Sequence, residues 1–173
     1  MCVIGRFILN KQEGFIMLAV ALGYPLGTLN DKYLVECNSK GVMLSFEEAA
    51  VWMNFNGIKE INDAKEDEFT ILRLASSGLI AVADSLEELW NKVINVVPVR
   101  QGAGTLDEGK TAIFLGEHAV RAEGPYFSAW QLCNGKRRIG DIYKFIEKDY
   151  KISKIDFLKL MSYLDEQDLI FFT

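Results

Sequence analysis

The chain has 173 residues, of which 50% are hydrophobic and 25% charged, and it carries a net charge of −5 with a pI near 5.0. This balance is typical of a globular protein and excludes a disordered chain or a coiled coil. Because the whole molecule is acidic, a nucleic-acid-binding role would require a local basic patch.

The cysteines and the single histidine limit the chemistry and the compartment. Cys2, Cys37 and Cys133 are widely spaced, and with His118 they do not form a zinc-binding pattern. An odd number of distant cysteines argues against a disulfide framework and favours a reducing, cytoplasmic compartment. The longest strongly apolar run, residues 15–22, is far shorter than the ~20 residues that span a bilayer. We therefore expect no membrane association, no metal and no cofactor.

The first half of the chain opens with an apolar segment, residues 14–22. Because it is apolar on every side, it predicts a buried helix that closes before Pro25, with a strand as the alternative. Asn56-Gly57 suits a left-handed helix C-cap. The other expected elements are a hairpin of residues 32–36 and 42–44, a helix over 46–55, a helical pattern over 69–75 and a closing strand over 79–82.

The second half repeats this order with one more helix. Ser85 followed by Glu88 is the pattern of a capping box, and the helix that it starts ends before Pro98. Ser153 is expected to cap the last helix. The remaining elements are a hairpin of residues 111–115 and 119–122, helices over 125–133 and 139–150, a last helix with Phe157, Leu160, Met161 and Leu164 in the core, and a closing strand over 169–172.

A sequence pattern recurs between the halves. W-x-x-x-N-G begins at Trp52 and again at Trp130, which is an offset of 130 − 52 = 78. Residues 27–31 match residues 104–108 at an offset of 104 − 27 = 77, so we place a single insertion near Gly109. Two matches in the same order favour an internal duplication over chance.

A third match lies at the end of each half, where residues 78–80 correspond to residues 168–170 at an offset of 168 − 78 = 90. The predicted boundaries are residues 11–83 and 84–173. Each half then has an N-terminal helix, a β-hairpin, two or three helices and a closing strand. This order predicts an α+β fold of tandem duplicated winged-helix-like domains.

Catalytic groups are not placed together in the sequence. His118 is the only imidazole, and it lies in a hairpin connector without a nucleophile beside it. Cys133 precedes Lys136 and Arg137, whose charges could lower the pKa of its thiol, but a half-buried structural cysteine is the favoured interpretation. We therefore expect that the chain is not an enzyme.

Residues 132–142 read L-C-N-G-K-R-R-I-G-D-I, after a predicted hairpin and before a last helix that closes with D-L-I. This order resembles the PqqD-like proteins, the precursor-peptide recognition elements of ribosomally made and modified peptides. The resemblance extends from Thr111 to Ile170 in the second half. The first half keeps the same frame but lacks the Lys-Arg pair and the middle helix.

The resemblance implies a non-catalytic module that adds the leader segment of a precursor peptide as an extra strand beside residues 118–122. The peptide side chains would dock against the helix of residues 154–167, and the partners would be the precursor peptide or its modifying enzyme. From the residues themselves, a flank of that helix is apolar at spacing i, i+3, i+7, which suits either an extended peptide or packing against the other half. The candidate peptide-binding residues are His118, Val120, Ala122, Ile155, Leu158, Lys159 and Ser162.

Two other functions remain open. A winged-helix DNA-binding regulator would use the basic run Lys136, Arg137 and Arg138, since winged helices commonly bind DNA. Against this, the last helix carries several carboxylates that phosphates would repel. A scaffolding subunit that docks onto a larger enzyme is the third alternative.

Overall fold

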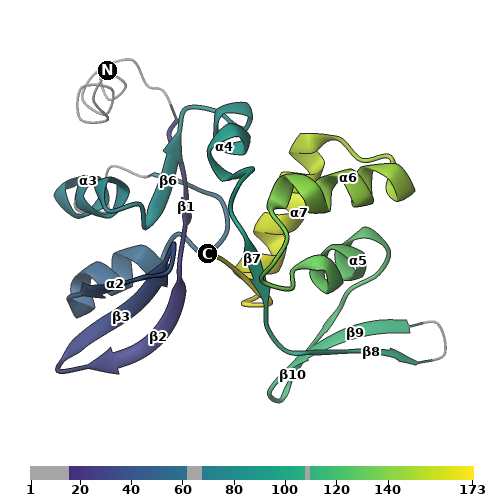
Figure 1. Cartoon of the computed structure of the whole chain (residues 1–173), viewed down its shortest axis with the longest axis horizontal. Coiled ribbons are helices and arrows are strands. Elements are labelled where there is room, and N and C mark those ends of the chain that lie inside the picture. The colour runs from purple at the N-terminus through teal and green to yellow at the C-terminus, as the bar shows by residue number, and fades with distance from the viewer. Residues whose placement is uncertain (1–15, 62–67, 108–109) are drawn as a thin grey trace. The chain divides into compact units, whose positions relative to one another are not determined.

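The structure is a computed structural model that describes residues 16–61, 68–107 and 110–173. The chain divides into two compact units, one ending at Asn91 and the other beginning at Lys92 (Figure 1). The described residues form six helices and several small antiparallel sheets, so the fold class is α+β. No helix among them is long and apolar enough to cross a bilayer.

The first unit combines two sheets with two short helices. One sheet has the strand order β5-β1-β6 and the other β2-β3-β4. A further helix, α4 (Leu86–Val93), begins in this unit and ends in the second. The elements are β1 (Leu18–Ala21), β2 (Tyr24–Leu29), β3 (Lys32–Cys37), β4 (Lys40–Leu44), α2 (Phe46–Met53), β5 (Lys59–Glu60), α3 (Glu68–Ser76) and β6 (Ile80–Ala83).

The helix expected over residues 14–22 is wrong, because the described part of this segment contains the strand β1. β1 lies between β5 and β6, and its residues Ala19, Val20 and Ala21 are buried. A central strand that is covered on both faces is apolar throughout, which is the same pattern as a buried helix. The alternative that the sequence left open, a strand, is therefore the one observed.

The predicted hairpin of the first unit is confirmed as β3 and β4, which pair antiparallel. Asn38 and Ser39 join them with φ of 50° and 60°. Positive φ at both central residues is the geometry of a type I′ turn, whose twist matches that of the strands. β2 adds a third strand that the sequence analysis did not predict.

The second unit has a three-stranded sheet, a two-stranded ladder and three helices. The sheet has the order β10-β9-β8, and the ladder joins β11 to β7. Of these strands, β7 and β8 were not predicted. The elements are β7 (Pro98–Arg100), β8 (Ala103–Asp107), β9 (Lys110–Leu115), β10 (His118–Arg121), α5 (Pro125–Leu132), α6 (Ile139–Tyr150), α7 (Lys154–Glu166) and β11 (Ile170–Phe172).

The predicted helices of the second unit are confirmed, and local signals explain them. The side chain of Ser153 accepts a hydrogen bond from the backbone N–H of Asp156 at 3.1 Å and so caps α7. Pro125 occupies the first turn of α5. The four predicted core residues of α7 are at most 4% exposed: Phe157, Leu160, Met161 and Leu164.

The two units make the same hydrogen bonds around their tryptophans. Trp52 is 2% exposed and its indole N–H donates to the carbonyl oxygen of Leu22 at 3.1 Å. Trp130 is 3% exposed and its indole N–H donates to the carbonyl oxygen of Gln101 at 3.0 Å. Leu22 and Gln101 each lead into a glycine with positive φ.

Backbone bonds recur at the same places. The N–H of Leu22 donates to the carbonyl oxygen of Leu79 at 2.7 Å, and that of Gln101 donates to Leu169 at 2.8 Å. One residue earlier, the backbone N–H of Ala21 donates to the carbonyl oxygen of Phe55 at 2.8 Å. In the second unit the backbone N–H of Arg100 donates to the carbonyl oxygen of Cys133 at 2.7 Å. The acceptors Leu79 and Leu169 are 90 residues apart, and the acceptors Phe55 and Cys133 are 78 residues apart. The same two offsets relate the matching patterns in the two halves of the sequence.

One of the sequence matches is out of register. Leu29 pairs with Lys32 in the first unit, and Asp107 pairs with Lys110 in the second. The offset between these equivalent ladder positions is therefore 78 (107 − 29 = 78) rather than 77. The insertion that we placed near Gly109 is therefore wrong, because the first unit instead has a register shift between Pro25 and Gly27.

Candidate functional site

The strand β10 lies at an edge of its sheet. It pairs with β9 on one side, and no other strand of the described chain pairs with its second side. The backbone N–H of Ala122 donates to the carbonyl oxygen of Thr111 at 3.1 Å, so this pair is a hydrogen-bonded one. Because such pairs alternate along an antiparallel ladder, the N–H and C=O groups of Ala119 and Arg121 point away from β9. The outer edge of β10 therefore presents backbone donors and acceptors.

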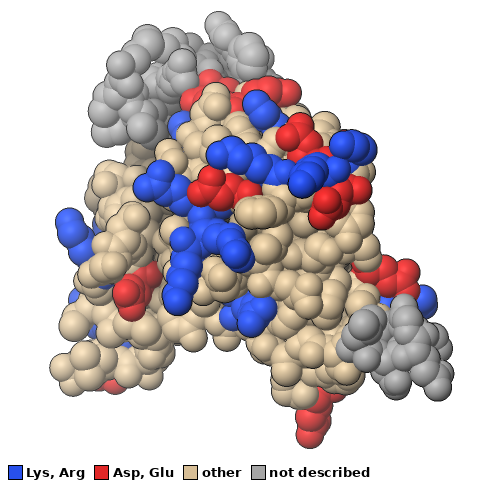
Figure 2. Space-filling view, turned by 45° about the vertical axis from the view of Figure 1, so that its right-hand side comes forward, with Lys and Arg blue, Asp and Glu red and all other residues tan. Residues whose placement is uncertain are grey.

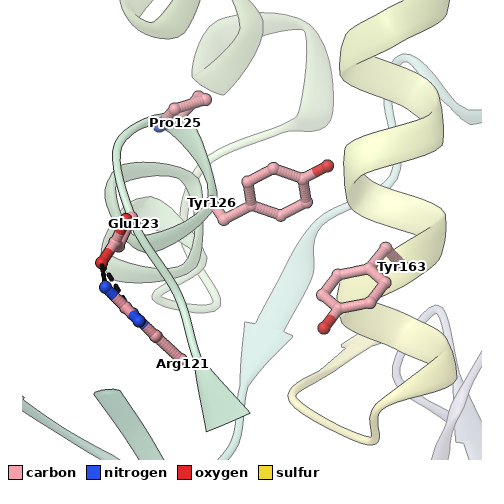
Figure 3. A pocket seen from close by; sticks show the side chains of 5 residues that line it. All are labelled: Arg121, Glu123, Pro125, Tyr126 and Tyr163. Carbon is pink, nitrogen blue, oxygen red and sulfur yellow. Dashed lines mark hydrogen bonds and ion pairs between the residues drawn. The ribbon is translucent and has the colours of Figure 1, made fainter. Parts of the chain in front are cut away.

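A pocket of about 380 Å³ lies between the end of β10 and the helix α7. Its lining comes from the strand end, the start of α5 and the middle of α7 (Figure 3). The residues that line it are Arg121, Glu123, Pro125, Tyr126 and Tyr163. The pocket thus joins the free strand edge to the last helix of the unit.

Two tyrosines form the aromatic wall of the pocket. Tyr126 extends from α5 towards Tyr163 on α7, and their ring centroids are 5.4 Å apart at an interplanar angle of 86° (Figure 3). This edge-to-face arrangement is favourable for aromatic pairs. Each tyrosine is 38% exposed, so the rings can be reached from solvent.

The opposite side of the pocket carries an ion pair. The guanidinium of Arg121 donates to the Glu123 carboxylate, with 2.7 Å from Nε to Oε1. Both side chains are largely exposed, so the pair has little effect on stability. It does neutralise the rim, which leaves the aromatic rings and Pro125 as the main apolar contact surface of the site.

The structure places the predicted peptide-binding residues in two groups. His118 and Lys159 are exposed, and Val120 and Ile155 are half-buried. Lys159 lies one turn before Tyr163 on α7, and therefore on the side of the helix that faces the pocket. His118 and Val120 belong to the edge strand β10, whereas Ile155 lies in the first turn of α7, two turns from Tyr163.

The side chains of the other three predicted residues are buried. Ala122 is 2% exposed, Leu158 1% and Ser162 7%. Ala122 directly follows β10, and its side chain lies on the same face as that of Val120, which is opposite the fully buried Ile113. In α7, Leu158 and Ser162 lie on a different side of the helix from Tyr163. None of the three is accessible to a ligand.

The sequence analysis missed the five residues that line the pocket. Tyr163 is separated from the apolar core stripe of α7, and an exposed aromatic residue in a helix gives no periodic signal. Tyr126 lies within the helix expected over residues 125–133, and no motif in the sequence marks it as a binding residue. The signal that could have found them is the presence of two tyrosines on the exposed sides of helices that are predicted to pack together.

The basic run lies in the loop before α6 and at its N-cap. The Arg137 guanidinium lies 5.7 Å from the ring centroid of Phe145, and Arg138 donates to the Asn95 amide oxygen at 3.4 Å. Figure 2 shows lysine and arginine side chains across one face of the molecule with carboxylates between them. Two side chains of the basic run therefore already have partners within the second unit.

The two described cysteines are buried. Burial raises the pKa of the Cys133 thiol far above its usual range, although the Arg100 guanidinium acts in the opposite direction. Burial also raises the pKa of Cys37. The alternative of an activated Cys133 is therefore wrong, and so is the expectation of a half-buried one. Within the described residues, no three His, Cys, Asp or Glu side chains are grouped so as to hold a metal.

Comparison with protein-family models, with curated proteins and with solved structures finds no match to this chain.

Proposed function

We propose that the second unit is a peptide-binding module that adds an extended peptide to the outer edge of β10 and takes one of its side chains into the tyrosine pocket. The main support for this proposal is that an unpaired strand edge and an aromatic pocket lie side by side among the described residues. In strand addition, backbone hydrogen bonds supply affinity and pockets for alternate side chains supply specificity.

The resemblance of residues 132–142 to the PqqD-like proteins supports the same function. It points to the leader segment of a precursor peptide as the ligand and to a modifying enzyme as the second partner. In this proposal the chain is a non-catalytic adaptor that works in the cytoplasm. The phenols and the neutralised ion pair of the pocket suit recognition better than proton transfer.

The matching hydrogen bonds of the two units support descent from one winged-helix-like unit. Trp52 and Trp130 each donate to a carbonyl oxygen in the segment that follows the first strand of their unit. Such a bond network is harder to reach by chance than a W-x-x-x-N-G match alone. We therefore propose a tandem duplication in which the first unit has lost the middle helix.

A proline at the strand edge tests the proposal. Ala119→Pro removes an outward N–H without removing a bond to β9, because the Ala119 N–H points away from that strand. We expect wild-type protein to enrich short extended peptides from a displayed random library. The selected peptide should bind Ala119→Pro at least about tenfold more weakly, a loss of one effective backbone hydrogen bond or more. Isothermal calorimetry measures the affinity.

Gly41→Pro is the matched control. Gly41 is the equivalent position of β4, opposite Glu36 as Ala119 is opposite Phe114. This variant should bind the peptide like the wild type. Equal affinity of wild type and Ala119→Pro would contradict strand addition at β10. Failure to enrich any peptide, together with retention on random duplex DNA, would favour the regulator instead.

A further inference from the structure

We propose that residues 48 and 73 of the first unit and residues 126 and 163 of the second decide which unit binds a peptide, so that the chain has one peptide site rather than two. This inference rests on the proposed function of the second unit. It concerns the place in the first unit that corresponds to the tyrosine pocket.

The correspondence follows from the offsets that relate the two units. Glu48 and Tyr126 are related by the offset of Trp52 and Trp130 (126 − 48 = 78). Arg73 and Tyr163 are related by the offset of Leu79 and Leu169 (163 − 73 = 90). Glu48 lies in α2 and Tyr126 in α5, each the first helix after the hairpin of its unit. Arg73 lies in α3 and Tyr163 in α7, each the helix before the closing strand.

Both pairs of residues are in contact, but their chemistry differs. In the second unit, Tyr126 and Tyr163 meet edge to face and remain accessible. In the first unit, the Arg73 guanidinium and the Glu48 carboxylate form an ion pair. An apolar contact between two helices in one unit is thus an ionic contact in the other.

Glu48 is held in place by a second bond. Its Oε2 accepts a hydrogen bond from the backbone N–H of Ser45 at 2.8 Å, while its Oε1 pairs with Arg73. The Ser45 hydroxyl in turn accepts a bond from the Glu48 N–H at 3.2 Å, which completes a capping box at the start of α2. The Glu48 side chain is only 13% exposed, so the carboxylate is fixed between the cap and Arg73.

This arrangement opposes an apolar ligand in the first unit. A peptide side chain that entered here would displace water from two charged groups without supplying hydrogen bonds, which is costly. β4 also has a free outer edge among the described strands, because its sheet has the order β2-β3-β4. A strand edge is therefore available in both units, but the place that the two tyrosines take in the second unit is taken by the Glu48–Arg73 ion pair in the first.

The stoichiometry of the wild-type chain is the first test. The probe is the peptide selected from the displayed library, and calorimetry on the full chain should give one peptide per chain. Two equivalent sites per chain would overturn the inference. Absence of any binding by the wild type would instead overturn the proposed function itself, so the two failures are distinguishable.

Exchange of the contact pair is the second test. Tyr126→Glu with Tyr163→Arg builds the ion pair of the first unit into the second, and it should weaken peptide binding at least about tenfold, since the aromatic walls are lost. Tyr126→Phe with Tyr163→Phe keeps the walls and should bind within about threefold of the wild type. If the doubly substituted protein does not fold, the single variant Tyr163→Arg is measured in its place and should also bind the peptide more weakly than the wild type.

The first unit supplies the matched control. Glu48→Gln with Arg73→Gln removes the charges there but keeps two polar side chains and adds no aromatic ring. We therefore expect both the affinity and the stoichiometry to be unchanged. Unchanged binding by the Tyr126→Glu, Tyr163→Arg protein, or a loss of binding in the Gln variant, would overturn the inference. Two-dimensional amide NMR spectra of each variant check that both units remain folded.

Discussion

Cys133 illustrates how the fold changes the chemistry of a single residue. Its thiol is 0% exposed and donates a hydrogen bond to the carbonyl oxygen of Ala129 at 3.1 Å. From its neighbours in sequence, Lys136 and Arg137, a lowered pKa was a reasonable alternative. Burial has the larger effect and raises the pKa, because an anionic thiolate would lose its hydration in the core.

This shift predicts a pH dependence of stability. The pKa of Cys133 is higher in the folded than in the unfolded chain, so the unfolded state releases this proton first as the pH rises. Below the ordinary thiol pKa of about 8.5 the thiol is protonated in both states, and its burial contributes fully to stability. Above that pH the free energy of unfolding falls, by up to ~1.4 kcal/mol per pH unit. Urea unfolding at pH 7, 8.5 and 9.5 measures it, and Cys133→Ala should show a smaller decrease. Parallel pH profiles for the two proteins would contradict the prediction.

At the scale of the element, α7 has two roles on two sides. Its core side holds Phe157 and Leu160, and the side bearing Lys159 and Tyr163 faces the pocket. The flank that the sequence assigned to the peptide contains Leu158, which is buried instead. A helix surrounded by other elements buries more than one stripe, so an apolar flank does not by itself indicate a binding groove.

Substitution of Leu158 separates these interpretations. From the sequence alone, Leu158→Asp would abolish peptide binding with little loss of helix. With Leu158 buried, the same change places an unpaired charge in the core and should lower the free energy of unfolding by at least about 2–5 kcal/mol, the range for truncating a buried leucine. Lys159→Asp, one residue further on the exposed side, should change it by less than about 0.5 kcal/mol. Circular dichroism during urea titration measures both. A normally stable Leu158→Asp protein would show that this side chain is accessible.

At the scale of the whole molecule, charge limits the choice of partner. The net charge is −5, and on the face shown in Figure 2 carboxylates lie among the lysines and arginines. Lys136, Arg137 and Arg138 are the densest basic run, and two of these side chains already have partners in Phe145 and Asn95. An acidic chain whose densest basic run is already partly engaged offers an extended polyanion few contacts.

We therefore expect no retention of the protein on immobilised random duplex DNA, even at about 50 mM salt. Phosphate contacts dominate non-specific binding and are strongest at low salt, so this is the condition most favourable to a DNA-binding protein. Retention that weakens as salt is raised, and that is lost when Lys136, Arg137 and Arg138 are all changed to alanine, would contradict this expectation and support the regulator.

Much of the fold could be predicted because its signals are local. The cap at Ser153 and the apolar periodicity of α6 and α7 each depend on a few neighbouring residues. The helix C-cap expected at Asn56-Gly57 is wrong, because α2 ends at Met53 and its C-cap is Asn54, although Gly57 does have a positive φ. The strand β1 was not predicted as such, since its apolar pattern suits both a central strand and a buried helix. Half of the candidate site, the strand β10 and the helix α7, was predicted. The pocket was not, because Arg121 and Tyr163 lie far apart in the chain, with two helices between them.

The sequence by itself determined the order of helices and hairpins and the recurrence of the W-x-x-x-N-G pattern in both halves. These properties come from side-chain periodicity, from caps and from turn residues, which act over a few positions. Only the tertiary structure decided that Leu158 is buried, that β10 has a free edge, and that two tyrosines meet where the first unit has an ion pair. Those outcomes depend on which distant segments pack together, and no local pattern contains that information.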